Sequence, residues 1–288
     1  MRRPLLARSL VWVLAGTVAA ASVRAAPPVV AVSVAPQREI VARLAGDAVE
    51  IVTLVPPGTD VETFAPAGQL IAARERAALG FRVGDAAFTL EARLVDPWLA
   101  RRRHLASVAL ADHVRGQPGS APAAAPHGDP HLWVSPRIVR GAAAELAVRL
   151  ARLLPGEAAA IRSRAVGLDA DIAGLQARLA ARLGGRGGRF LIDHPSLGHL
   201  ARDYGLEQIA IEHEGKEPTP AQLARLVERA RRDKFRIVLT QRNVARRGAE
   251  VLAREIGAEL VEVDPLAPDW LANMERIGAI LARALVRE

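Results

Sequence analysis

At residues 128–136 the chain reads Gly-Asp-Pro-His-Leu-Trp-Val-Ser-Pro, between an Ala/Pro-rich loop and a helical pattern. Pro130 favours an extended conformation at the preceding Asp129. Ser135 followed by Pro136 is typical of a helix N-cap and first helical residue. His131 is therefore expected on a rigid, non-helical turn, presented rather than packed. A histidine before a helix is more often incidental than a ligand, so its interpretation depends on what other loops supply.

On both sides of this segment, short apolar strands alternate with helices. Before it we predict strands at 29–34, 49–55, 79–83 and 105–110, helices at 36–45, 67–78 and 88–102, and a loop at 116–126. After it we predict helices at 136–154 and 157–183, then strands at 189–193, 207–211, 236–240 and 259–263, alternating with helices at 196–204, after Pro220, at 246–256 and from 268. Such alternation predicts parallel sheets covered on both faces.

The fold expected from this pattern is α/β, with two lobes, each a parallel sheet flanked by helices, joined by one long linking helix. We predict a signal peptide at 1–25, an N-terminal lobe at 26–154, the linking helix at 155–184 and a C-terminal lobe at 185–288. A helix over 157–183 would span roughly 40 Å, enough to cross between lobes.

Residues 1–25 have the pattern of a secretory signal. Arg2, Arg3 and Arg8 precede an apolar run at 10–21, and a small-residue cleavage site ends near Ala25. An uncleaved anchor is the alternative, and the Arg2-Arg3 pair leaves twin-arginine export open beside the general secretory route. With no cysteine to lipidate, a soluble protein in the periplasm of a two-membrane bacterium is expected.

Charge and cysteine content exclude some classes of function. Without the four arginines of residues 1–25, the formal net charge falls from +8 to +4. The remaining basic residues are scattered and lack interleaved aromatics, which is against nucleic-acid binding. The chain has no cysteine, so it has neither disulfides nor a thiolate metal site.

Four polar side chains occur in loops that follow predicted strands or precede the central helix. They are Glu62, His131, His194 and Asp264. Because ligands in such sheets bind at the carboxyl ends of strands, two imidazoles and two carboxylates could enclose a divalent cation. The three besides His131 also have local explanations: a solvated turn for Glu62, neighbouring hydrogen bonds for His194, and turn formation before proline for Asp264.

Nearly the whole mature chain resembles the zinc/manganese family of periplasmic solute-binding proteins that serve metal-importing ABC transporters. The matching stretches follow one another in the family's order: 29–35, 45–47, 54–58, Gly84 with Glu91, 129–136, 193–195, 201–206, 217–220 and 263–266. The resemblance implies two α/β lobes bridged by a long helix, with one metal ion bound between them. Lobe movement in such a protein is expected to be small.

The resemblance also implies a set of ligands. His131 matches a ligand histidine of the N-terminal lobe, His194 matches that of the C-terminal lobe, and Asp264 matches the carboxylate that completes the site in many members. Glu62 departs from the pattern, because the family usually has histidine there. Gln241 is a second departure, where related proteins often carry an acidic residue.

The exchange at Glu62 bears on the choice of metal. Carboxylate oxygen is harder than imidazole nitrogen, so this donor set tolerates Mn²⁺ or Fe²⁺ better than a histidine-rich zinc site does. Glutamate is also a common zinc ligand. We expect zinc, with manganese or iron as the alternative.

Two further sets of residues carry expectations. Asp129 and Asp193 are expected to accept hydrogen bonds from the ligand histidines beside them. The other histidines match no ligand position and are interpreted as exposed or locally hydrogen-bonded: His104, His113, His127, His199 and His213.

The expected action is capture of a divalent metal ion and its delivery, by a monomer, to a membrane permease and its ATPase. A secreted metallohydrolase is the alternative from another class. The chain has no His-Glu-x-x-His pattern, serine nucleophile elbow or Gly-rich phosphate loop, so we expect no enzyme. A binder of an organic solute is a third possibility, which ten aromatic residues in the whole chain make unfavourable.

Overall fold

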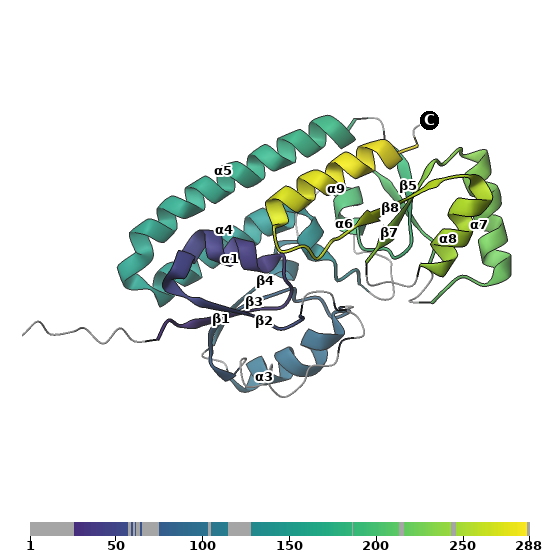
Figure 1. The fold of residues 1–288 in the computed structure, drawn as a ribbon. Coiled ribbons are helices and arrows are strands. Elements are labelled where there is room, and N and C mark those ends of the chain that lie inside the picture. The colour runs from purple at the N-terminus through teal and green to yellow at the C-terminus, as the bar shows by residue number, and fades with distance from the viewer. Residues whose placement is uncertain are drawn as a thin grey trace, which may run out of the picture.

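Two parallel sheets form the framework of the protein. The computed structural model describes residues 26–56, 59, 61, 64, 75–102, 105–114, 128–185, 187–212, 216–242 and 246–286. Within these residues the strand orders are β2-β1-β3-β4 and β6-β5-β7-β8, and the strands within each sheet pair in parallel. Each sheet comes from one half of the sequence, which confirms the predicted α/β fold (Figure 1).

The first sheet contains β1 (Val29–Val32), β2 (Glu50–Thr53), β3 (Ala77–Arg82) and β4 (Ala106–Ala109). Helices α1 (Gln37–Ala45) and α4 (Pro136–Leu153) lie on one side of it, and α3 (Asp96–Arg101) lies on the other (Figure 1). A π-helical turn at Glu91–Val95 leads into α3, and a 3-10 turn at Leu132–Val134 precedes α4. All four residues of β1 are buried, as expected for a strand covered on both faces.

The second sheet contains β5 (Arg189–Ile192), β6 (Glu207–Ala210), β7 (Ile237–Gln241) and β8 (Glu259–Val263). Its helices are α6 (Gly198–Asp203), α7 (Pro220–Arg232), α8 (Arg247–Ile256) and α9 (Trp270–Ala284). A small core beneath α7 and α8 includes Val227, Val238 and Leu252. A larger core includes residues of both sheets, such as Val30 and Phe190, so the halves share buried surface.

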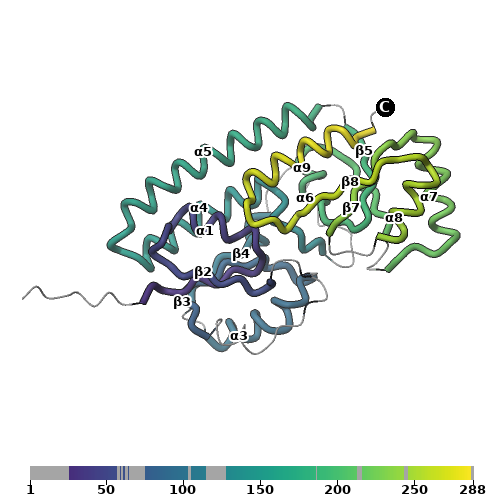
Figure 2. Tube along the Cα trace, in the orientation of Figure 1, coloured from purple at the N-terminus to yellow at the C-terminus, as the bar shows by residue number. Residues whose placement is uncertain are grey.

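Helix α5 (Ala158–Leu183) crosses from one half of the molecule to the other. At 1.5 Å per residue, its 26 residues span about 39 Å. The side chains predicted to form its apolar face are buried: Leu168, Ile172, Leu175, Leu179 and Leu183. Figure 2 follows the tube of α5 from the end of α4 to the loop before β5, with α9 running beside it.

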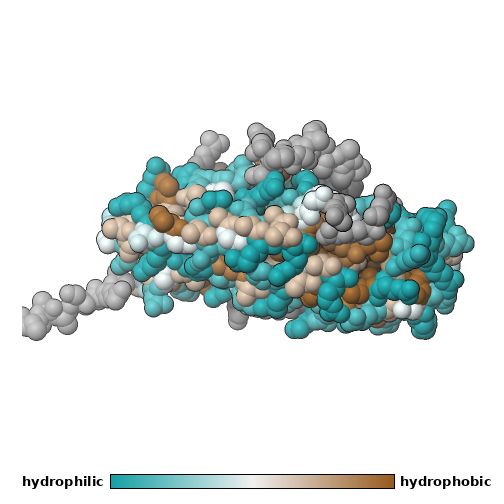
Figure 3. Space-filling model, turned by 90° about the horizontal axis from the view of Figure 1, so that it is seen from above, coloured by the Kyte–Doolittle hydropathy of each residue, from teal (hydrophilic) through white to brown (hydrophobic). Residues whose placement is uncertain are grey.

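The side of the molecule that carries α5 and α9 is mixed in character. Hydrophilic residues are interspersed with smaller apolar areas when it is seen from above (Figure 3). The large hydrophobic side chains exposed in the described part of the chain are Val148, Val166 and Leu260. No helix in the described ranges combines the length and apolarity needed to span a bilayer.

One predicted boundary is wrong. The helix expected at 67–78 overlaps β3, which starts at Ala77 rather than at Leu79. Ala77 and Ala78 have high helix propensity, but Ala77 pairs with Val29 of β1, and this tertiary pairing outweighs local preference. Residues 65–74, the predicted loop at 116–126 and the predicted signal peptide at 1–25 lie outside the described residues.

Candidate metal site

His131 lies where the central segment enters its 3-10 turn. Ser135 is the N-cap of α4, and its Oγ accepts a hydrogen bond from Ile138 N–H at 3.2 Å, which confirms the predicted cap. The ring of His131 is packed, contrary to expectation, because the residue is only 4% exposed. Asp129 Oδ1 accepts from the backbone N–H of His131 at 3.0 Å and lies 2.8 Å from its Nδ1, so the predicted role of Asp129 is confirmed.

The charge of Asp129 is favoured by its histidine neighbours. Burial would raise the pKa of its carboxyl, but the hydrogen bond and charge of His131, together with the charge of His199, lower it below its usual value. His199 is buried, with its Nε2 2.8 Å from the backbone carbonyl of Asp129. The prediction of local hydrogen bonding for His199 is therefore confirmed. His104, His127 and His213 lie outside the described residues.

His194 follows β5, and the prediction for Asp193 is confirmed for the backbone of His194 but not for its ring. Asp193 accepts hydrogen bonds from the backbone N–H groups of His194 at 2.6 Å and Gln241 at 2.8 Å, so it fixes the main chain. The ring Nδ1 of His194 instead faces Glu212, whose carboxylate oxygens lie at 3.2 and 3.3 Å. Glu212 lies in the loop after β6, just as His194 and Asp264 lie after β5 and β8. This position in the sequence could have identified Glu212 as a candidate site residue.

The second departure, Gln241, has a structural explanation. Its side-chain amide donates to the carbonyl of His194 at 3.0 Å and to Asp193 Oδ1 at 3.3 Å. Burial raises the pKa of Asp193, although these hydrogen bonds act in the opposite direction. An acidic side chain at 241 would place a second negative charge beside Asp193, whereas the neutral amide supplies donors.

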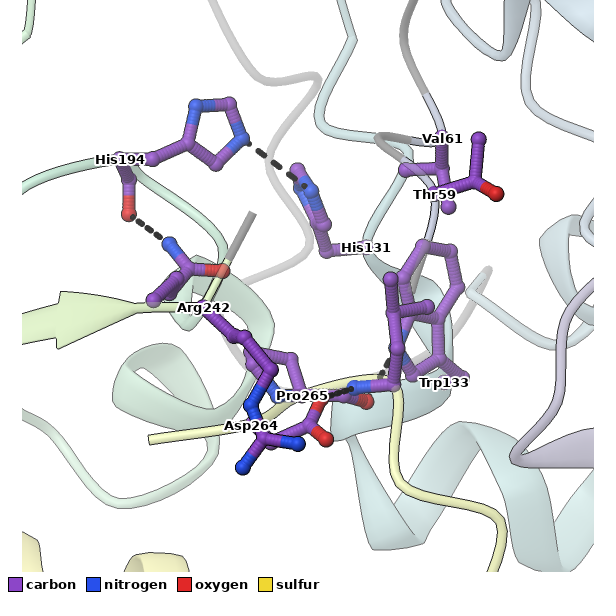
Figure 4. Close-up of a pocket in the computed structure, with 10 residues that line it drawn as sticks. Thr59, Val61, His131, Trp133, His194, Arg242, Asp264 and Pro265 are labelled. Atoms are coloured by element: carbon purple, nitrogen blue, oxygen red, sulfur yellow. Dashed lines mark hydrogen bonds between the residues drawn. The ribbon is translucent and has the colours of Figure 1, made fainter. Parts of the chain in front are cut away.

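The two histidines meet across the boundary between the lobes. Their Nε2 atoms are 3.4 Å apart, and their rings are inclined at 72° (Figure 4). Two nitrogens that bind one tetrahedral zinc ion at about 2.0–2.1 Å are themselves roughly 3.3–3.4 Å apart. The separation in the structure therefore suits two ligands of a single ion.

A small cavity of about 40 Å³ adjoins the pair, and its lining residues are Thr59, Val61, His131, Trp133, His194, Gln241, Arg242, Asp264, Pro265 and Leu266. One water-sized sphere needs about 10–15 Å³, so the space suits an ion with a few waters rather than an organic solute. Asp264 thus reaches the same cavity from the end of β8, half-buried, with Oδ1 accepting from Leu266 N–H at 2.9 Å.

The described residues do not complete a coordination shell. Among them, no three histidine, aspartate or glutamate side chains are grouped closely enough to hold a metal ion. The structure brings His131 and His194 together and places Asp264 in the wall of their cavity. Glu62, the fourth predicted ligand, lies outside the described residues.

Two tryptophans frame this site and were not singled out from the sequence. Trp133 Nε1–H donates to the carbonyl of Pro265 at 2.9 Å, and Trp270 Nε1–H donates to the carbonyl of Trp133 at 2.7 Å. The Trp133 ring also packs against His131, with centroids 5.2 Å apart. The floor of the cavity is thus tied to both lobes.

Comparisons with known proteins agree with this architecture. The model of a family described as "Zinc-uptake complex component A periplasmic" matches residues 30–284. A putative metal-binding protein of Treponema pallidum is 26% identical over 244 residues, which cover 77% of this chain and 74% of that protein. The zinc-binding lipoprotein AdcA of Streptococcus pneumoniae is 22% identical over 80% of this chain, which spans only 48% of AdcA.

A solved structure extends the similarity to three dimensions. The crystal structure of ZnuA superposes with a TM-score of 0.79 and 29% identity, covering 90% of this chain and 99% of that one. The similarity therefore includes both sheets and the helix that crosses between them.

Proposed function

The chain belongs to the family of periplasmic zinc-uptake components, and we propose that it captures one divalent transition metal ion, zinc, between its lobes and delivers it to an ABC importer. The observation that carries this proposal is the 3.4 Å separation of His131 Nε2 and His194 Nε2, contributed by opposite lobes. Neither lobe alone supplies both imidazoles, so the ion would be held only where the lobes meet.

The proposed ligands are His131, His194, Asp264 and Glu62. The first two already face each other, and Asp264 lines the cavity beside them. The assignment of Glu62 rests on its position in the sequence. With two nitrogen and two oxygen donors, the site suits zinc and also tolerates Mn²⁺ or Fe²⁺, which remain the alternative cargo.

Binding rather than catalysis is the proposed role. The family is one of solute-binding proteins. The cavity beside the histidines has about 40 Å³, which leaves little room for an organic substrate next to a bound ion. These points favour a metal carrier over a secreted metallohydrolase.

The remaining organisation is part of the same proposal. Residues 1–25 are a signal peptide cleaved near Ala25, 26–154 the N-terminal lobe, 155–184 the linking helix and 185–288 the C-terminal lobe. The mature monomer works in the periplasm. It docks on a membrane permease whose partner ATPase drives import.

The first test combines intact mass, elemental analysis and calorimetry on protein purified from its own periplasm. We expect a mass that lacks the first 25 residues and about one equivalent of zinc. His194→Ala should abolish tight zinc binding, because one of two imidazole donors is lost, and Glu62→Ala should weaken binding while the fold stays intact. His113→Ala is the matched control, since His113 pairs with Glu145 at 3.3 Å and is not among the residues that line the cavity.

Each outcome separates the candidates. Manganese or iron in the purified protein would identify the alternative cargo. Unchanged zinc affinity in both His194→Ala and Glu62→Ala would refute the proposed site. Absence of any bound metal, with no heat on titration of the apo protein, would refute metal carriage altogether.

A further inference from the structure

Glu212 is half-buried and is not one of the proposed metal ligands. It lies two residues beyond β6, and its backbone N–H donates to the carbonyl of Asp193 at 2.9 Å. This bond extends the pairing of β6 with β5 past the ends of both strands. Glu212 is thereby fixed beside His194, and its side chain is 17% exposed.

The two ring nitrogens of His194 face opposite sides. Nδ1 faces the carboxylate of Glu212, with oxygens at 3.2 and 3.3 Å, while Nε2 faces His131 and the cavity. His131 has the equivalent arrangement, since its Nδ1 lies 2.8 Å from Asp129 Oδ1. Each lobe therefore presents an imidazole with a carboxylate on the side away from the cavity.

We infer that Glu212 is a positioning residue for His194: it accepts the Nδ1–H hydrogen bond and so keeps the lone pair of Nε2 directed at the bound ion. This inference rests on the proposed function, because it concerns the same metal site. A carboxylate behind a ligand histidine fixes its tautomer and orientation and makes it a stronger donor. Glu212 also adds negative charge close to the cation.

Two other carboxylates near His194 in the described part of the chain are placed differently. Asp193 is occupied by the backbone N–H groups of His194 and Gln241. Glu217 lines a cavity of about 120 Å³ together with Glu212, but it is exposed to solvent. Glu217 is therefore a matched control: an acidic side chain beside the same cavity whose removal should leave His194 in place.

The experiment measures zinc affinity by competition calorimetry in the full mature chain, for Glu212→Met, Glu212→Gln and Glu217→Gln. Methionine removes the acceptor at similar side-chain length, and we expect a loss of about 10–100-fold in affinity. Glutamine keeps an acceptor oxygen and should lose less. Glu217→Gln should bind as the wild type does.

A second readout reports on the ring itself. In apo protein labelled with ¹⁵N-histidine, the ring nitrogens of His194, assigned from their loss in His194→Ala, should show the Nδ1–H tautomer in the wild type and in Glu212→Gln. In Glu212→Met the Nε2–H tautomer should become populated. A role limited to packing would not produce this change.

The outcomes distinguish this inference from the proposed function. If the wild type binds zinc and Glu212→Met has the same affinity and tautomer, Glu212 does not position His194, although the carrier function stands. Equal losses in Glu212→Met and Glu212→Gln, with the tautomer unchanged in both, would assign the effect to packing and also overturn the inference. A wild type that binds no zinc would overturn the proposed function, and the tautomer would then still test the hydrogen bond.

Discussion

Glu91 is a fully buried carboxylate at the carboxyl end of the first sheet. It accepts hydrogen bonds from Ser33 Oγ–H, from Val83 N–H at 2.7 Å and from Gly84 N–H at 2.6 Å. Burial raises the pKa of this carboxyl above 4.5, although the hydrogen bonds and the charge of Arg82 oppose the shift. Glu91 thus ties together the ends of β1 and β3.

Glu91→Gln should make the unfolding free energy less dependent on pH. The pKa of Glu91 is higher in the folded than in the unfolded protein, so the native state binds the proton more tightly. The stability that this proton contributes is therefore full below the unfolded pKa and is lost as pH rises through the folded pKa. The glutamine amide cannot titrate. Its NH₂ group is a donor that would face another donor, and the unpaired buried group lowers the free energy of unfolding by about 1–3 kcal/mol. Urea unfolding from pH 4 to pH 8 should show the wild-type advantage shrinking. An advantage that stays constant over this range would contradict the assignment.

Local sequence signals identified some site residues, whereas others depend on contacts between strands. The proline and the helix cap within one segment predicted the roles of Asp129, His131 and Ser135. The contacts of Glu212 with His194 and of Gln241 with Asp193 join residues that follow or end different strands. Adjacency therefore pointed to the wrong carboxylate for the ring of His194. No local pattern specifies such pairs.

At the scale of elements, the contact between α5 and α9 depends on a residue without a side chain. A Cβ built on Gly278 of α9 would lie 2.2 Å from Cδ2 of Leu179 on α5, and Leu179 is fully buried. The apolar spacing of α5 predicted its buried face correctly, but it did not reveal which element would cover that face. This partner comes from the far end of the chain, about 100 residues away.

In Gly278→Ala the new methyl group overpacks the α5–α9 contact at a cost of about 1–3 kcal/mol, which we expect to outweigh the gain of up to about 1 kcal/mol in helix propensity. Gly167→Ala is the matched control, since Gly167 lies on the exposed face of α5 with nothing within 4 Å of the added Cβ. Alanine there should stabilise by up to about 1 kcal/mol through its higher helix propensity. Thermal and urea unfolding would measure both. Stabilisation in both variants would show that the helices are packed less closely than the structure indicates.

For the molecule as a whole, several hydrogen bonds cross between the lobes. Ser135 Oγ–H donates to Asp203 Oδ2 at 2.6 Å, and Leu271 N–H donates to Glu39 Oε2 at 3.0 Å. These add to the indole bonds of Trp133 and Trp270. The alternation of strands and helices predicted two sheets, whereas the way they face each other depends on such bonds and could be anticipated only through resemblance to a family.

These cross-lobe bonds, together with α5, predict that zinc binding changes the distance between the lobes by less than about 2 Å. The chain has no cysteine, so Val148→Cys on α4 and Ala224→Cys on α7, both exposed, would carry the only spin labels. Pulsed electron paramagnetic resonance should give the same mean distance in apo and zinc-bound protein. Trp270→Phe, which removes the N–H donated to Trp133, should broaden the apo distribution because one cross-lobe bond is lost. A shift of several ångströms on zinc binding in the unaltered background would instead mean that the lobes close around the ion as hinged bodies.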